Sequence, residues 1–188
     1  MLQPDLLSRF THHLKEALQK SLAFAIASGR EQVAPGDLIV GLLQEPGSIA
    51  AEVLSKASIR TEEAENDFRG SPTPHEPGTP IAPDLSVGVK RILEKAVLLA
   101  HLHEHRYIGT EHLLLAIFEI APEDIIAFLD GRGLNIQLAK EQLRGVLQSI
   151  ARFPEFTEKI AEQAVEAEEE GETADPATDA GANPGFSR

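Results

Sequence analysis

An internal repeat is the feature that most constrains what this chain can fold into. A shift of 75 residues aligns 14–59 with 89–134 without a gap. Identical pairs include Leu38 with Leu113 and Leu54 with Leu129, and most of the other apolar positions agree in character. The breaks between the apolar runs also match. We interpret this as one structural unit made twice; the alternative is that unrelated amphipathic helix pairs fall into register by chance.

The spacing of apolar residues predicts that each copy is helical. Ser86 and Thr11 are predicted N-caps, because their hydroxyls can accept a backbone amide of the first turn; Thr61 and Thr110 are predicted to cap in the same way. The expected helices are 11–27, 35–43, 48–55 and 61–68 in the first copy. In the second copy they are one from Val89 to Ala100 or beyond, 110–119, one that follows Pro122 and ends at 131–133, and one from Asn135.

The predicted fold class is therefore all-α, with two tandem four-helix repeats related by pseudo-twofold symmetry. We expect the first repeat at 8–69, a linker at 70–84 and the second repeat at 85–151. The linker holds five prolines in fifteen residues, which keep it extended. Residues 152–188 are expected to form an acidic, largely disordered tail, since they offer little apolar surface to bury.

Each copy is too small to bury all of its apolar faces alone, so the two are expected to pack along a shared hydrophobic seam. The residues predicted for this seam, any of which could face its own copy instead, are Leu18, Leu22, Leu38, Leu42, Leu93, Val97, Leu113 and Ile117.

Composition excludes several classes of protein. The chain has no cysteine, which rules out disulfides, thiolate metal sites and cysteine nucleophiles. Its formal charge is −13, of which −8 falls in 154–188, so nucleic acid is a poor partner. No apolar run reaches the roughly 20 residues that span a bilayer, and the N-terminus lacks a signal-peptide pattern. We expect a cytoplasmic protein.

Two stretches resemble the N-terminal domain of Clp-type AAA+ unfoldases. They are "FTHHLKEALQKSLAFA" (10–25) and "HEHRYIGTEHLLLAIF" (103–118), with "GTEHLLL" the most specific part. The first copy departs from the motif, because Pro35 and Gly36 replace its threonine and acid. The phosphate-binding loop of an ATPase is absent, since no G-x-x-x-x-G-K-[ST] pattern occurs. The chain thus looks like a free-standing domain of this type.

The resemblance implies a binding protein and not an enzyme. Such domains bind substrate polypeptides, degradation signals or adaptor proteins of a Clp-type chaperone–protease system. We expect a monomer that needs no cofactor and no metal, with protein or peptide as its partner. The predicted contact residues are Tyr107, Thr110, Glu111 and His112. A rival hypothesis with the same fold is a regulator that competes with a Clp unfoldase for adaptors.

Glu111 has two interpretations. It can simply occupy the first turn of a helix, where the helix dipole favours an acid. By resemblance, the acid of this motif also receives the guanidinium of phosphoarginine-marked substrates in some family members. A carboxylate suits that task, since it accepts a bidentate guanidinium.

The histidines His101, His103, His105 and His112 form the other cluster with chemical potential. His101 and His105 are four residues apart and would share one helix face, where they could ligate a metal. A small metal-dependent hydrolase is therefore a further alternative. The competing interpretation is a solvated helix end at which histidine favours the C-terminal dipole.

Overall fold

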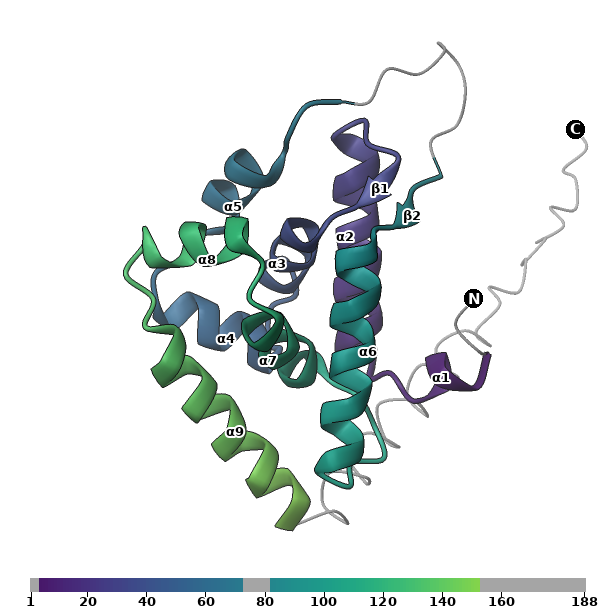
Figure 1. Cartoon of the computed structure of the whole chain (residues 1–188), viewed down its shortest axis with the longest axis vertical. Coiled ribbons are helices and arrows are strands. Elements are labelled where there is room, and N and C mark those ends of the chain that lie inside the picture. Colours follow the sequence, from purple (N-terminus) through teal and green to yellow (C-terminus); the bar gives the residue numbers. More distant parts are fainter. Residues whose placement is uncertain (1–3, 73–81, 153–188) are drawn as a thin grey trace, which may run out of the picture. The chain divides into compact units, whose positions relative to one another are not determined.

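The computed structural model describes residues 4–72 and 82–152. The described residues of both halves belong to one compact unit. In the first half the described elements are α1 (Pro4–Ser8), α2 (His12–Ala27), β1 (Gln32–Val33), α3 (Pro35–Leu43), α4 (Ile49–Lys56) and α5 (Thr61–Phe68). In the second half they are β2 (Asp84–Leu85), α6 (Val87–Leu102), α7 (Thr110–Ile120), α8 (Glu123–Asp130) and α9 (Ile136–Arg152) (Figure 1).

The mostly helical fold confirms the predicted all-α class. Helix α1 was not predicted, nor were the two-residue strands. Asp84, assigned to the linker, lies in β2. Residues 73–81 of that linker, and the predicted tail from 153 onward, lie outside the described residues. Within the described ranges, no helix is long and apolar enough to cross a membrane.

Two of the four predicted N-caps are confirmed. The Thr11 hydroxyl accepts the Leu14 amide at 3.3 Å, and the Ser86 hydroxyl accepts the Val89 amide at 3.3 Å. The predictions for Thr61 and Thr110 are wrong, because each is the first helical residue and the cap precedes it. A glycine before Thr110 can take the extended cap conformation, which leaves the threonine hydroxyl free to reach another helix.

The shift of 75 residues that aligns the sequence also relates backbone contacts in the two halves. Val33 of β1 pairs in parallel with Leu85 of β2, and an isolated parallel bridge joins Phe10 to Ile108, which are the equivalent positions. The Ser86 amide donates to the Val33 carbonyl at 3.0 Å, and the Thr11 amide donates to the Ile108 carbonyl at 3.0 Å. These paired contacts support the predicted duplication, and each of them joins one half to the other.

The centre of the core is built by α3 and α7. Helix α2 packs on α3, α6 packs on α7, and α3 and α7 also contact each other. Of the predicted seam residues, five are buried, namely Leu38, Leu42, Leu93, Leu113 and Ile117. Leu18 and Val97 are partly buried against the same core.

Leu22 is the exception, since it is 38% exposed and the prediction for it is wrong. The buried face of α2 runs through Leu14, Ala17, Ser21 and Phe24, which turns Leu22 to the outside. The apolar spacing did not indicate that Ser21 is buried. This polar residue can be buried because its hydroxyl donates to the Ala17 carbonyl at 2.7 Å.

Gly41 sets the close approach of α3 to α2. A Cβ on Gly41 would lie 2.2 Å from both the Ala17 carbonyl oxygen and the Ser21 hydroxyl. Backbone atoms of α2 thus occupy the space that any side chain at this position would need, and the two helices can pack this tightly only with glycine there.

We therefore predict that Gly41→Ala lowers the free energy of unfolding by about 1–3 kcal/mol, the usual cost of overpacking a core. Gly145→Ala is the matched control, since Gly145 lies in α9 with no atom near the new Cβ. That substitution should raise the free energy of unfolding by about 0.5–1 kcal/mol through helix propensity. Urea denaturation measures both, and equal effects of the two substitutions would contradict the packing account.

Candidate binding site

The structure places the four predicted contact residues at and just before the first turn of α7. Thr110, Glu111 and His112 are all buried, with 2%, 7% and 1% of their surface exposed. The Thr110 hydroxyl accepts the Ala50 amide of α4 at 3.4 Å. Tyr107 is partly exposed, with the Arg106 guanidinium 5.2 Å from its ring centroid. The contact assignment stays a prediction, and for three of these residues it requires the helix start to open.

His105 and His112 form a buried hydrogen-bonded pair. His105 Nδ1 lies 2.8 Å from His112 Nε2, and His105 Nε2 lies 3.1 Å from the Leu147 carbonyl of α9. The Gly109 amide donates to His112 Nδ1 at 3.0 Å. Burial, followed by the influence of His112, lowers the pKa of His105 below its ordinary value. The pair therefore links the start of α7 to α9 through the loop that follows α6.

The prediction that His101 and His105 share one helix face is wrong. Helix α6 ends at Leu102, and Glu104 then takes a left-handed conformation with φ 58°. His105 is turned into the core while His101 stays exposed. In the part of the chain that the structure describes, no group of three or more His, Cys, Asp or Glu side chains is placed to hold a metal ion.

Arg30 and Asp37 stand in the first half where His105 and His112 stand in the second. Arg30 forms an ion pair with Asp37, whose side chain is fully buried. Asp37 also accepts the Ala34 amide at 2.7 Å, as His112 accepts the amide of Gly109. Burial raises the pKa of the Asp37 carboxyl, although Arg30 acts in the opposite direction. Each half thus has one side-chain pair that holds the start of its central helix.

Glu111 fills a space that the first half fills in another way. Its two carboxylate oxygens lie 2.4 Å from the place where a Cβ on Gly109 would be. The first half has Ala34 at the position of Gly109 and Gly36 at the position of Glu111. The ring of Phe68 covers Gly36 so closely that a Cβ there would lie 2.4 Å from it. Where the second half has Glu111, the first half therefore has Gly36 with the ring of Phe68 packed over it.

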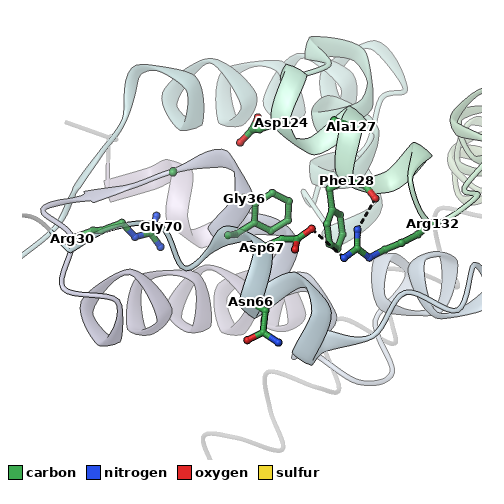
Figure 2. A pocket seen from close by; sticks show the side chains of 11 residues that line it. Arg30, Gly36, Asn66, Asp67, Gly70, Asp124, Ala127, Phe128 and Arg132 are labelled. Atoms are coloured by element: carbon green, nitrogen blue, oxygen red, sulfur yellow. Dashed lines mark hydrogen bonds and ion pairs between the residues drawn. The ribbon is translucent and has the colours of Figure 1, made fainter.

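A hollow of about 720 Å³ opens beside Gly36. Figure 2 shows the side chain of Arg132 reaching the ring of Phe128 on α8, and the Arg132 guanidinium lies 3.7 Å from the ring centroid. Arg132 also contacts Asp67 at 3.0 Å and Glu63 at 3.3 Å. The Phe68 ring lies 4.7 Å from that of Phe128. The remaining lining residues are Arg30, Ala34, Asn66, Gly70, Asp124 and Ala127.

Two further hollows occupy equivalent places in the two halves. One of about 770 Å³ lies where the end of α3 meets α4 and the start of α5. The other, of about 520 Å³, lies where the end of α7 meets α8 and the start of α9. Leu43 and Ile59 line the first, and their equivalents Phe118 and Leu134 line the second. The shift of 75 residues relates these two hollows, whereas the hollow beside Gly36 is lined by residues of both halves.

Sequence reasoning missed the hollow beside Gly36 and both side-chain pairs. The departure at Pro35 and Gly36 was visible as a loss of the acid, and it marks the place where the hollow opens. The identity of the residues across it, on α5 and α8, depends on how the two halves pack, which no local pattern records.

The pair of Arg30 and Asp37 gives a direct test of what holds the start of α3. We predict that Arg30→Met lowers the free energy of unfolding by about 3–5 kcal/mol, because it leaves a buried charge without a partner. The loss should diminish as the pH falls below the raised pKa of Asp37, since the folded variant then holds a proton more tightly than the unfolded chain.

Adding Asp37→Asn to this variant should restore part of the stability, because it removes the unpaired charge. Chemical denaturation at several pH values measures all three proteins. A loss below about 1 kcal/mol in Arg30→Met, a value typical of surface pairs, would contradict the account.

Comparison with known proteins places the chain in a family. Residues 9–131 match the model of the Clp repeat (R) N-terminal domain. The chain is 26% identical to the chaperone ClpB of Mycobacterium leprae over 158 residues, which cover 81% of the chain and 18% of ClpB. It is 30% identical over 142 residues to a functionally uncharacterised protein of Mycobacterium tuberculosis, covering 76% of the chain and 55% of that protein. The chain thus spans only part of these relatives.

Solved structures with the same fold agree with this assignment. The N-terminal domain of the chaperone ClpD from Arabidopsis thaliana has a TM-score of 0.64 at 21% identity and covers 78% of this chain and 99% of that one. A ClpV N-domain, solved in complex with a VipB peptide, has a TM-score of 0.60 at 18% identity and covers 78% and 92%. This chain belongs to the Clp repeat N-terminal domain family.

Proposed function

We propose that this chain is a non-catalytic binding module for polypeptides, and that the hollow beside Gly36 is its contact surface. The observation that carries the proposal is this open hollow between the halves, in a chain of a family with a peptide-bound ClpV relative. Peptide grooves combine apolar surface for side chains with a few polar groups that orient the backbone. The lining has both, since Phe68 and Phe128 stand beside Asn66, Asp67 and Arg132.

The charges around the hollow disfavour an acidic partner. Arg132 is already engaged by Asp67 and Glu63, and Arg30 by Asp37. Since a desolvated charge needs a partner of its own, an acidic ligand would have to displace Arg132 or Arg30 from its carboxylate partner. An extended apolar peptide segment requires no such exchange, which is why we assign that class of ligand to the hollow.

The proposed context is a Clp-type chaperone–protease system, with substrate polypeptides or adaptor proteins as partners and the cytoplasm as location. The rival proposal is a regulator that competes with a Clp unfoldase for its adaptors. The two differ in what they retain: immobilised protein incubated with an adaptor and an unfolded substrate should keep the substrate in the first case. Retention of the adaptor alone would favour the regulator.

We predict that Ala127→Arg weakens binding of an unfolded polypeptide by about tenfold or more, since the added side chain fills the hollow and tenfold corresponds to about 1.4 kcal/mol. Ala127 is exposed on α8 and lines the hollow. Ala23→Arg is the matched control, because Ala23 is equally an exposed helical alanine but lies on α2. Fluorescence anisotropy of labelled β-casein measures both variants.

If the parent protein does not bind β-casein, the proposal of general polypeptide binding is wrong. If both variants bind as tightly as the parent, binding exists but the hollow is not its place. A similar loss in both variants would point to the added charge and would also count against the hollow.

Phosphoarginine recognition through Glu111 has a separate test. Because Glu111 is 7% exposed and turned back toward Gly109, we predict no measurable heat when a phosphoarginine peptide is titrated at neutral pH. Isothermal titration calorimetry measures it, with the unmodified arginine peptide as control. Heat that disappears in Glu111→Gln would overturn this prediction and assign the ligand to the carboxylate.

A further inference from the structure

The buried histidine pair has a fixed hydrogen-bond direction. The chain of contacts runs from the Gly109 amide to His112 Nδ1, from His112 Nε2 to His105 Nδ1, and from His105 Nε2 to the Leu147 carbonyl. A backbone amide can only donate and a carbonyl can only accept. His112 Nδ1 must therefore carry a lone pair, and His105 Nε2 must carry a hydrogen.

Two ring protons satisfy all three of these hydrogen bonds. If both imidazoles are neutral and carry their hydrogen on Nε2, then His112 donates to His105 and His105 donates to Leu147. All four ring nitrogens are then used, and no donor meets another donor. Of the neutral arrangements, it is the one in which none of these three contacts joins two donors or two acceptors.

A third proton has one favourable position, His112 Nδ1, but the lone pair of that atom already accepts the Gly109 amide. Glu111 Oε1 lies 3.0 Å from His112 Nδ1, the same atom that accepts the Gly109 amide at 3.0 Å. Without a proton there, the carboxylate oxygen faces a lone pair. A proton on Nδ1 would be shared with Glu111 in a charge-assisted bond, but it would also oppose the Gly109 N–H and end that hydrogen bond.

We propose that His105, His112 and Glu111 form a proton-operated latch, which holds the first turn of α7 closed when the two imidazoles are neutral and releases it when they take up one proton from solvent. The added proton ends on His112 Nδ1, against Glu111 Oε1, and the Gly109 amide loses its acceptor. The released turn carries Thr110, Glu111 and His112, which are otherwise buried.

The first half has a different pair of side chains at the positions of His105 and His112. At the equivalent positions, Arg30 and Asp37 make an ion pair, and Asp37 holds the Ala34 amide as His112 holds that of Gly109. Arginine keeps its charge at all pH values that proteins meet. The start of α3 is therefore held by a pair whose arginine keeps its charge, and the start of α7 by two imidazoles, a group that can take up a proton.

The surroundings of the latch set the sign of its response. The His103 ring lies 5.8 Å from that of His105, and Arg9 donates to the His105 carbonyl at 3.3 Å. From α9 comes the Leu147 carbonyl, while Arg144 of that helix is engaged by Glu119 at 2.9 Å. Besides burial, His112 and His103 lower the pKa of His105, and Glu111 raises it.

Burial, with His112 second, lowers the pKa of His105, so this ring binds a proton more weakly in the closed latch than it would if exposed. An exposed imidazole titrates at about pH 6.5. The closed form is therefore fully favoured above that pH, and its stability relative to the open form decreases as the pH falls below it.

The test is amide hydrogen exchange of the full chain between about pH 8 and about pH 5, corrected for intrinsic rates, with the Gly109 amide as reporter. We expect its protection to fall by about tenfold per pH unit below pH 6.5, because opening takes up one proton. The Ala34 amide is the internal comparison and should lose less protection, since Asp37 holds it together with Arg30, whose charge does not change in this range. This latch does not depend on the proposed polypeptide binding, so either can fail alone.

Two variants sharpen the result. The double substitution His105→Arg and His112→Asp installs the pair of the first half and should remove the pH dependence at Gly109, while His101→Gln should leave it unchanged. Long-range ¹H–¹⁵N correlations on the unmodified protein assign the tautomers, and we expect hydrogen on Nε2 of both rings at about pH 8. Equal slopes at Gly109 and Ala34, or a hydrogen on His112 Nδ1 at that pH, would overturn the proposal whether or not the double variant folds.

Discussion

Two helix N-termini lie inside the core, and the rest of the structure depends on how they are satisfied. The first amides of a helix have no partner within the helix, and burial without one is costly. At α3 the Asp37 side chain takes the Ala34 amide, and at α7 the His112 ring takes the Gly109 amide. Because α3 and α7 contact each other and each packs on the long helix of its own half, these contacts hold the helices at the centre of the core.

The solutions at α3 and α7 differ in chemistry but agree in position. Arg30 and His105 follow the long helix of each half, and both reach the third residue of the helix that comes next. The residues beside these pairs differ together. The first half has Ala34 and Gly36 where the second half has Gly109 and Glu111. At the hollow beside Gly36, Phe68 covers the helix start, whereas at α7 the Glu111 carboxylate lies there.

Much of the fold could be predicted from the sequence, because it follows from local patterns. The apolar spacing gave the helices of both halves, and Thr11 and Ser86 gave two of their starts. Predictions failed where a residue's role depends on a distant partner. Thr110 looks like a cap, yet its hydroxyl reaches Ala50 of α4. Ser21 looks like a surface residue, yet it is buried against Gly41 while Leu22 is exposed.

The candidate site was harder to predict for the same reason. The motif directed attention to Glu111 and its neighbours, which the structure buries, whereas the hollow lies at the matching position of the half that lost the motif. A sequence shows that Gly36 replaces an acid, but not that Phe68, Phe128 and Arg132 meet beside it. That meeting needs α5 and α8, which come from different halves.

The central claim is that this hollow, and not the buried turn of α7, receives a polypeptide at neutral pH. Backbone amide chemical-shift mapping of the labelled chain during titration with unlabelled β-casein tests it most directly. The account predicts that the largest changes fall on Gly36, on 66–68 and on 124–132. Changes confined to 107–112, or the absence of any change at saturating β-casein, would contradict it.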